Sequence, residues 1–211
     1  MKRVSKALAA LVCASLLTAG LTGCGGEKSA DTIKVGANLE LTGGINGKKL
    51  ELVVADNKSE AAEAANAMQK LISQDNVVAV IGPNLSSSVI AASAINNGAK
   101  VPDITPMGTN PNITVDPATG KTRDFNYRTC FIDPFQGTVM ATFAKDDLNA
   151  GSAAILIDNS SDYAKGLAQF FKENFVKNGG TVTAEESYLQ KDTDFKATLT
   201  KIKAGNPDFL Y

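Results

Sequence analysis

The 211-residue sequence contains no histidine. This absence excludes Ser-His-Asp and Cys-His nucleophilic sites and histidine-rich zinc sites, so we expect neither an enzyme nor a bound metal or cofactor. Basic clusters are also missing and the formal net charge is −1, which argues against a nucleic acid as partner. The sequence further lacks an apolar run of the roughly 20 residues that a membrane-spanning helix needs.

The N-terminus has the layout of an export signal. A basic start at residues 2–6 precedes an apolar stretch from Ala7 to Leu17. The segment ends in Leu-Thr-Gly-Cys at residues 21–24, which resembles the lipobox of bacterial lipoproteins. That resemblance implies that Cys24 is acylated and that the chain is cleaved just before it. An ordinary cleaved signal with an incidental cysteine is the alternative interpretation.

We expect four segments along the chain. Residues 1–23 form the lipoprotein signal peptide, and residues 24–31 form a small, polar tether between lipid and domain. Residues 32–127 form an N-terminal α/β lobe, and residues 128–211 form part of a second α/β lobe. Processing leaves 188 of the 211 residues, which is enough for one sizeable core or for two small lobes.

Cysteine is scarce, with three residues in the chain. Cys13 leaves with the signal and Cys24 carries lipid, so Cys130 has no partner for an intrachain disulfide. Cys130 stands in an apolar stretch, which favours a buried small hydrophobe over a reactive thiol.

After the tether, β-rich and helix-like segments alternate along the chain. The predicted strands are Ile33–Leu39, Leu50–Ala55, Val77–Ile81, Val101–Thr105, Ala153–Asp158, Thr181–Tyr188 and a last one beginning near Asp208. The predicted helices are Ala61–Ser73, Ser88–Asn96, Phe135–Asn149, Tyr163–Asn178 and Phe195–Ala204. The continuous aliphatic run at 77–81 indicates a strand buried on both faces. Repeated β-α-β units predict an α/β fold of two doubly wound parallel-sheet lobes, the second incomplete, with the lobe boundary in the irregular loop 106–133.

Two features indicate a fragment of a larger fold. The first two strands are joined by only about ten residues, 40–49, whereas a helical crossover between parallel strands needs a dozen or more. These strands therefore either pair as a hairpin around Gly43-Gly44 and Asn46-Gly47 or are joined by loop alone. The chain also stops at residues 209–211, within an apolar strand whose exposed edge is a poor terminus.

The segment Gly82–Ser88 lies between a strand-like run and the start of a helix. We expect its serine hydroxyls and the backbone N–H groups of the first helical turn to face the carboxyl edge of the sheet. Converging donors and the helix dipole favour an anion there, and open α/β sheets bind ligands at this edge. A serine that merely caps its helix is the alternative, and it explains one hydroxyl better than three in a row.

The next strand ends in the segment Thr105–Pro111, which should emerge beside the serine loop. Proline and glycine hold this segment in an irregular path, so that carbonyls such as that of Met107 have no partner in a strand ladder. Thr109 offers a second hydroxyl to the same anion. For this segment taken alone, a turn-rich connection without any ligand is the favoured alternative.

Taken in order, these motifs resemble those of the branched-chain amino acid binding proteins of ABC importers. Gly-Pro-x-x-Ser-Ser-Ser at 82–88 is followed by Thr-Pro-x-x-Thr-Asn-Pro at 105–111 and by Tyr-Arg at 127–128. Asp-Tyr-Ala-Lys-Gly at 162–166 matches a further landmark of that family. The similarity runs from about Ile33 to the end of the chain.

The resemblance implies two type I periplasmic-binding lobes that close on an amino acid without catalysing a reaction. The ligand-binding residues that it implies, matched by position, are Leu85, Ser86, Ser87, Met107, Thr109 and Tyr163. Ser86 and Thr109 would hold the ligand carboxylate, and the Met107 carbonyl would receive an ammonium proton. Tyr163 would close the site from the second lobe, with Leu85 and Ser87 as secondary contacts. A zwitterion needs donors on one side and acceptors on the other, in a cleft that excludes water.

The chain departs from the family pattern in two places. Family members carry a long helix between the first two strands, whereas here Thr-Gly-Gly-Ile at 42–45 runs across that gap. The acidic residue for the ligand amine and the rest of the second lobe would lie beyond Tyr211, so only the carboxylate half of the site is present. We therefore expect a truncated member of the family with an internal deletion.

The predicted function is that of an extracytoplasmic solute-binding lipoprotein that captures an amino acid of the branched-chain type for the permease of an ABC importer. We expect an exported monomer, held by lipid on the outer face of the bacterial cell membrane or in the periplasm. A ligand-sensing receptor domain of the same fold is one alternative, since the residues do not distinguish delivery from signalling. A serine-dependent α/β hydrolase is another, disfavoured because no histidine is available as base and Gly-x-Ser-x-Gly is absent around Ser86.

Overall fold

The structure is a computed structural model that describes residues 46–211. The predicted signal peptide, the tether, Cys24 and the first strand, Ile33–Leu39, lie outside the described residues. The described part begins with a turn in which Asn46 and Gly47 both have positive φ angles, 51° and 76°. Asn-Gly turns of this kind close tight hairpins. One of the two predicted connections is a hairpin around this turn, and it stays a prediction because the strand expected to precede the turn lies outside the described residues.

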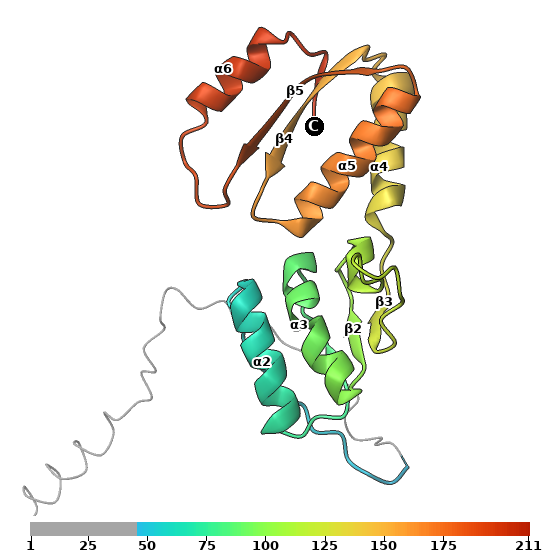
Figure 1. The fold of residues 1–211 in the computed structure, drawn as a ribbon, viewed down its shortest axis with the longest axis vertical. Coiled ribbons are helices and arrows are strands. Elements are labelled where there is room, and N and C mark those ends of the chain that lie inside the picture. The colour runs from blue at the N-terminus through green and yellow to red at the C-terminus, as the bar shows by residue number, and fades with distance from the viewer. Residues whose placement is uncertain (1–45) are drawn as a thin grey trace, which may run out of the picture. The chain divides into compact units, whose positions relative to one another are not determined.

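Residues 52–211 contain two three-stranded sheets (Figure 1). The N-terminal sheet has the order β1-β2-β3, formed by Val80–Ile81, Asp103–Thr105 and Asn126–Arg128. The C-terminal sheet has the order β5-β4-β6, formed by Thr181–Tyr188, Ser152–Asp158 and Phe209–Leu210. All pairings within both sheets are parallel. The predicted α/β class with parallel sheets is therefore confirmed.

The helices follow the strands as the sequence predicts, with small shifts at their ends. They are α2 (Ala61–Ser73), α3 (Ser86–Ala99), α4 (Asp133–Thr142), α5 (Asp162–Lys177) and α6 (Lys196–Ala204). The helix predicted to run to Asn149 instead leaves α-helical geometry after Thr142 and continues as a π-helical turn, Phe143–Asp147. Within residues 46–211, every helix is too short or too polar to span a bilayer.

Helices cover both faces of the C-terminal sheet. Lys172 of α5 forms an ion pair with Glu185 at 2.6 Å, while Lys201 of α6 forms one with Glu186 at 3.1 Å. Neighbouring residues of a strand point to opposite faces, so α5 and α6 lie on opposite sides of β5. Between α5 and the sheet, Phe171 is fully buried. It belongs to an apolar cluster formed by Ala141, Ala144, Ala150, Ala153, Ile155, Ala168, Phe171 and Phe175.

The N-terminal sheet is covered on one face by the described residues. Helices α2 and α3 lie side by side (Figure 1), and α3 packs over the face that carries the buried side chains of Asp103 and Asn126. On the opposite face, Ile81 is 82% exposed and Tyr127 is 50% exposed. The prediction that the run 77–81 is buried on both faces is therefore wrong, because both described helices of this region pack on the same side of the sheet.

Two strand predictions also need correction. Residues 50–55 are not in a strand in the structure, and the strand expected to pair with them, Ile33–Leu39, lies outside the described residues. Conversely, β3 lies inside the segment 106–133 that was predicted to be irregular loop. Its residues pair with β2, with Ile104 opposite Tyr127.

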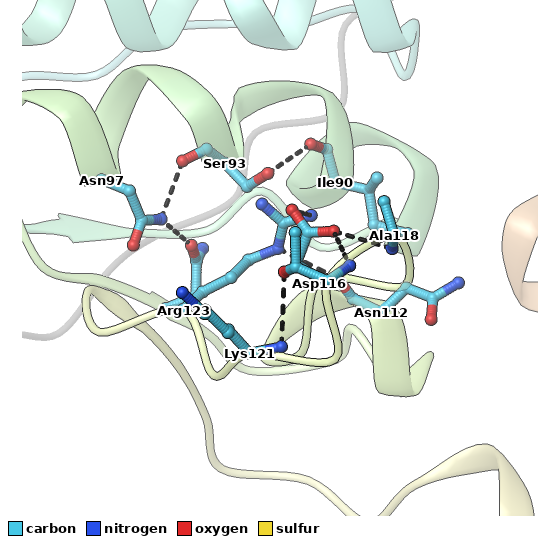
Figure 2. Close-up of polar contacts among 10 residues, drawn as sticks. Ile90, Ser93, Asn97, Asn112, Asp116, Ala118, Lys121 and Arg123 are labelled. Atoms are coloured by element: carbon cyan, nitrogen blue, oxygen red, sulfur yellow. Dashed lines mark hydrogen bonds and ion pairs between the residues drawn. The ribbon is translucent and has the colours of Figure 1, made fainter.

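Polar contacts hold the rest of that segment in place (Figure 2). The Arg123 guanidinium lies 3.6 Å from the Asp116 carboxylate, and its Nε donates to the Asn112 carbonyl at 3.4 Å. The Asn97 side-chain amide of α3 donates to the Ser93 carbonyl at 2.8 Å and also to the Asn126 side chain of β3. The Phe125 N–H, just before β3, donates to the Asn97 side chain at 3.2 Å, so the end of the segment between β2 and β3 is bound to α3.

Candidate functional site

Helix α3 begins at Ser86, two residues before the predicted start. Leu85 is its N-cap residue, with φ −79° and ψ 135°, and no side chain caps this helix. The interpretation that a serine merely caps the helix is therefore wrong. Because no side chain occupies them, the N–H groups of the first turn can bind a ligand, and the helix dipole adds positive potential there.

The three consecutive serines have different environments. The Ser86 hydroxyl is buried and accepts a hydrogen bond from the Asn110 backbone N–H at 3.3 Å. The Ser87 hydroxyl accepts one from the backbone N–H of Asp162, the first residue of α5, at 2.9 Å. The Ser88 side chain is 1% exposed and points into the protein. The expectation that all three hydroxyls face the carboxyl edge of the sheet is therefore wrong for Ser88, whereas Ser86 and Ser87 line the cavity described below.

The segment Thr105–Pro111 emerges beside the serine loop, as the order of the strands predicts. The Thr105 hydroxyl donates to the Pro83 carbonyl at 2.7 Å and so ties the two loops together. Arg128 of β3 donates through Nη1 to the carbonyls of Gly108 and Asn110, at 3.3 and 3.0 Å. These bonds replace a strand ladder and hold the irregular path of this segment.

Within this segment the two predicted ligand contacts differ in exposure. Met107 is exposed, whereas Thr109 is buried, with 5% of its surface exposed. The Thr109 hydroxyl oxygen meets no hydrogen-bond partner of good geometry among the described residues. The Asp133 carboxyl group is its neighbour within the protein, and a bound anion would supply a further partner.

One cavity of about 540 Å³ brings all six predicted ligand-binding residues together. It is lined by Leu85, Ser86, Ser87, Met107, Thr109 and Tyr163, and also by Ser59, Asn84, Pro106, Cys130, Phe131, Gln136, Asp158, Ser160, Ser161 and Gln190. The sequence analysis missed the last ten as lining residues. A cap signal could have found Ser161, because its hydroxyl accepts a hydrogen bond from the Ala164 N–H and caps the helix that carries Tyr163.

The cavity combines two helix N-termini with few charged side chains. The first turns of α3 and α5 both contribute lining residues, so both helix dipoles direct positive potential toward the cavity. Asp158 is the one charged residue among the described residues that line it. Its carboxylate accepts hydrogen bonds from the N–H and the hydroxyl of Ser160. An anion would therefore be bound by amides and hydroxyls rather than by a lysine or an arginine.

A polar chain leads from the cavity wall into the protein. Burial raises the pKa of Asp133, while the nearby Thr109 hydroxyl and the Arg128 guanidinium oppose this rise. The Gln136 amide lies 3.5 Å from the Asp133 carboxyl group, and the Tyr163 hydroxyl donates to Gln136 at 3.3 Å. Burial also raises the pKa of Tyr163, so that its hydroxyl remains a donor at neutral pH.

Known proteins resemble this chain over most of its length. A profile of the family described as "Periplasmic binding protein" matches residues 16–211. An amino acid binding protein from Pseudomonas aeruginosa is 33% identical over 174 residues, which cover 82% of this chain and 45% of that protein. A Leu/Ile/Val-binding protein homolog 3 from Brucella melitensis is 30% identical over 186 residues, covering 86% of this chain and 49% of that protein.

Solved structures agree with these relatives. The leucine binding protein LivK from Thermotoga maritima has a TM-score of 0.73 and 40% identity, covering 78% of this chain and 45% of that one. A second neighbour is the branched-chain amino acid transporter substrate binding protein LivJ from Streptococcus pneumoniae, which was solved in complex with isoleucine. It has a TM-score of 0.67 and 42% identity, and the match covers 76% of this chain and 44% of that one. The chain thus spans about half the length of the relatives it matches. The motifs, the parallel α/β fold and these similarities together show that the chain belongs to the periplasmic binding protein family.

Proposed function

We propose that this chain is a non-catalytic, extracytoplasmic solute-binding protein that captures an amino acid of the branched-chain type for an ABC importer. The observation that carries this proposal is the cavity of about 540 Å³, which gathers residues from two neighbouring loops and from the start of α5. Relatives named as Leu/Ile/Val-binding proteins, and a structural neighbour solved with isoleucine, support the choice of ligand class.

The carboxylate of the ligand would bind where the donors converge. In this proposal the hydroxyls of Ser86 and Thr109 donate to it, together with N–H groups of the first turn of α3. Thr109 carries the buried hydroxyl that meets no partner of good geometry within the described protein. Hydrogen bonds to a charged group, formed away from water, are stronger than those between neutral groups.

The other end of the ligand needs acceptors and an apolar surface. The Met107 carbonyl accepts no hydrogen bond from the described residues, and in this proposal it receives an ammonium proton. Leu85 and Phe131 are partly exposed apolar residues on the cavity lining, and they offer contact area to an aliphatic side chain. Tyr163 would cover the ligand from the side of α5.

Calorimetric titration with leucine, isoleucine and valine tests this proposal. We expect Ser86→Ala and Thr109→Ala each to weaken binding by about 1–3 kcal/mol, because each removes a hydrogen bond to a charged group. Ser88→Ala is the matched control, since it makes the same change in the same helix turn at a side chain that does not line the cavity. Unchanged affinity in both site variants would exclude these hydroxyls from binding. Absence of heat with all three amino acids would contradict the ligand class.

We also propose that the chain is exported and held at a membrane by lipid on Cys24. The support is the basic start, the short apolar stretch and the Leu-Thr-Gly-Cys ending of residues 1–24. Cys24→Ser should release the protein from membranes, whereas Cys130→Ser, which changes the thiol on the cavity lining, should leave it attached. Retention of a processed Cys24→Ser protein in the membrane fraction would contradict lipid attachment.

A further inference from the structure

Two hydrogen bonds link the region of the N-terminal sheet to the start of α5, and both involve the same residue. The Asp162 N–H donates to the Ser87 hydroxyl at 2.9 Å, and the Asn110 side-chain amide donates to the Asp162 carbonyl at 2.7 Å. Both polar backbone groups of Asp162 are therefore bound by side chains more than fifty positions away in the chain. The next residue, Tyr163, lines the cavity.

Asn110 is held rigidly for this contact. Its backbone N–H donates to the Ser86 hydroxyl at 3.3 Å, and its side-chain oxygen accepts from the Asn112 N–H at 2.9 Å. Its carbonyl accepts from Arg128 at 3.0 Å, and the residue is 6% exposed. Three groups thus anchor Asn110 to its own side of the cavity, and the remaining amide group reaches α5.

A glycine allows α5 to come this close. Gly166 lies one turn after Asp162, and a Cβ atom placed on it would lie 2.9 Å from the Asn110 side-chain nitrogen and still closer to the Asp133 carboxylate. Any larger side chain at this position would push α5 away from Asn110. The contact therefore depends on the absence of a side chain at Gly166 as well as on the side chains of Ser87 and Asn110.

A third contact, between the sequence neighbours of the lining residues Ser59 and Gln190, is much weaker. Lys191 lies 3.6 Å from Glu60, but their side chains are 88% and 57% exposed. Exposed ion pairs of this kind add little to stability. Ser87 and Asn110 therefore carry the connection, and Lys191 offers a suitable control.

We propose that Ser87 and Asn110 are positioning residues: together they hold Asp162 and thereby place Tyr163 over the bound amino acid. This inference rests on the proposed function and deepens it, because it assigns Ser87 to holding α5 rather than to contacting the ligand. The two side chains act as a clasp between the parts of the protein that line the cavity. Loss of the clasp frees the start of α5 and shortens the time for which a ligand stays bound.

Hydrogen exchange at the Asp162 amide, measured by NMR, tests the clasp without any ligand. We expect Ser87→Ala and Asn110→Asp to speed this exchange about tenfold or more. Asn110→Asp keeps the side-chain oxygen that binds the Asn112 N–H but removes the donor to Asp162. Ser88→Ala and Lys191→Ala should leave the rate unchanged, and the amide of Phe171 in the α5 core should be unaffected in all variants.

Binding kinetics provide the second measurement. In stopped-flow experiments with leucine, the two clasp variants should dissociate about tenfold faster with little change in the association rate. Unchanged protection of the Asp162 amide in both variants would overturn the clasp, and so would an equal loss of protection along all of α5. Because exchange is measured without ligand, it can support the clasp even if leucine does not bind, so the two proposals fail separately.

Discussion

The two sheets differ in how their cores are built. The C-terminal sheet is covered on both faces and encloses an apolar cluster in which Phe171 stacks on Phe175 and on Tyr211, with ring centroids 5.3 and 4.1 Å apart. The N-terminal sheet has described helices on one face only, and its buried groups are largely polar, including Asn96 and Asp103. One region is stabilised by packing, and the other contains a network of hydrogen bonds.

This difference follows from what each region contributes to the cavity. The N-terminal region supplies two loops that have no strand ladder, and side-chain hydrogen bonds of Arg128, Ser86 and Thr105 hold those loops. The C-terminal region supplies the start of one helix, α5, and the apolar cluster beneath this helix holds it in place. Buried polar groups specify the positions of the loops, and apolar packing fixes α5.

The largest expected effect tests the apolar core. Phe171→Ala removes a fully buried ring, so we expect the free energy of unfolding to fall by about 3–5 kcal/mol in urea denaturation. Phe135→Ala is the control, because that ring is 61% exposed and its loss should change stability far less. Equal effects of the two variants would contradict the assignment of the core.

Replacing a glycine by alanine should lower the stability of the protein in the C-terminal region and raise it in the N-terminal region. A Cβ on Gly137 would lie 2.5–2.7 Å from atoms of Phe170 and Phe171, so Gly137→Ala forces α4 and α5 apart and should destabilise by about 1–3 kcal/mol. A Cβ on Gly98, in α3, would meet no atom within 4 Å, and Gly98→Ala should stabilise by about 0.5–1 kcal/mol. Thermal unfolding of both variants checks the prediction, which fails if the two substitutions shift stability with the same sign.

The polar core predicts a dependence of stability on pH. Burial raises the pKa of Asp103 to about 7, while the hydrogen bond from Asn126 opposes this rise. The folded protein therefore keeps a proton that the unfolded chain releases near pH 4, and this stabilisation is lost as the pH rises toward and through 7. In urea denaturation between about pH 4 and pH 8, wild type should lose stability relative to Asp103→Asn, which has no charge to bury. A constant difference across this range would contradict the raised pKa.

The smallest effect is expected on the open face of the N-terminal sheet. Ile81→Ala should change the free energy of unfolding by less than about 0.5 kcal/mol, because the side chain is 82% exposed. The same substitution at Ile155, which is buried in the C-terminal sheet, should destabilise by about 2–5 kcal/mol. A large loss at Ile81 would show that another part of the molecule covers this face.

Local patterns in the sequence predicted most elements closely. The helix Ala61–Ser73 and the strand Thr181–Tyr188 match the prediction residue for residue, because their periodic signals lie wholly within the segment. The start of α3 was placed late, since Leu85 carries no cap signal although it takes the extended conformation of a cap residue. The strand Asn126–Arg128 was missed because it is short and exists only through its ladder with β2.

The sequence by itself determined the class of fold, and its resemblance to a known family implied the six residues that share one cavity. For the two loops 82–88 and 105–111 there is also a physical reason, because the carboxyl ends of neighbouring parallel strands meet at one edge of a sheet. Only the tertiary structure decided which sheet face is covered, that Ser88 points inward, and that Ser87 and Asn110 meet Asp162. These outcomes depend on the packing of segments distant in the chain, and local patterns carry no record of such contacts.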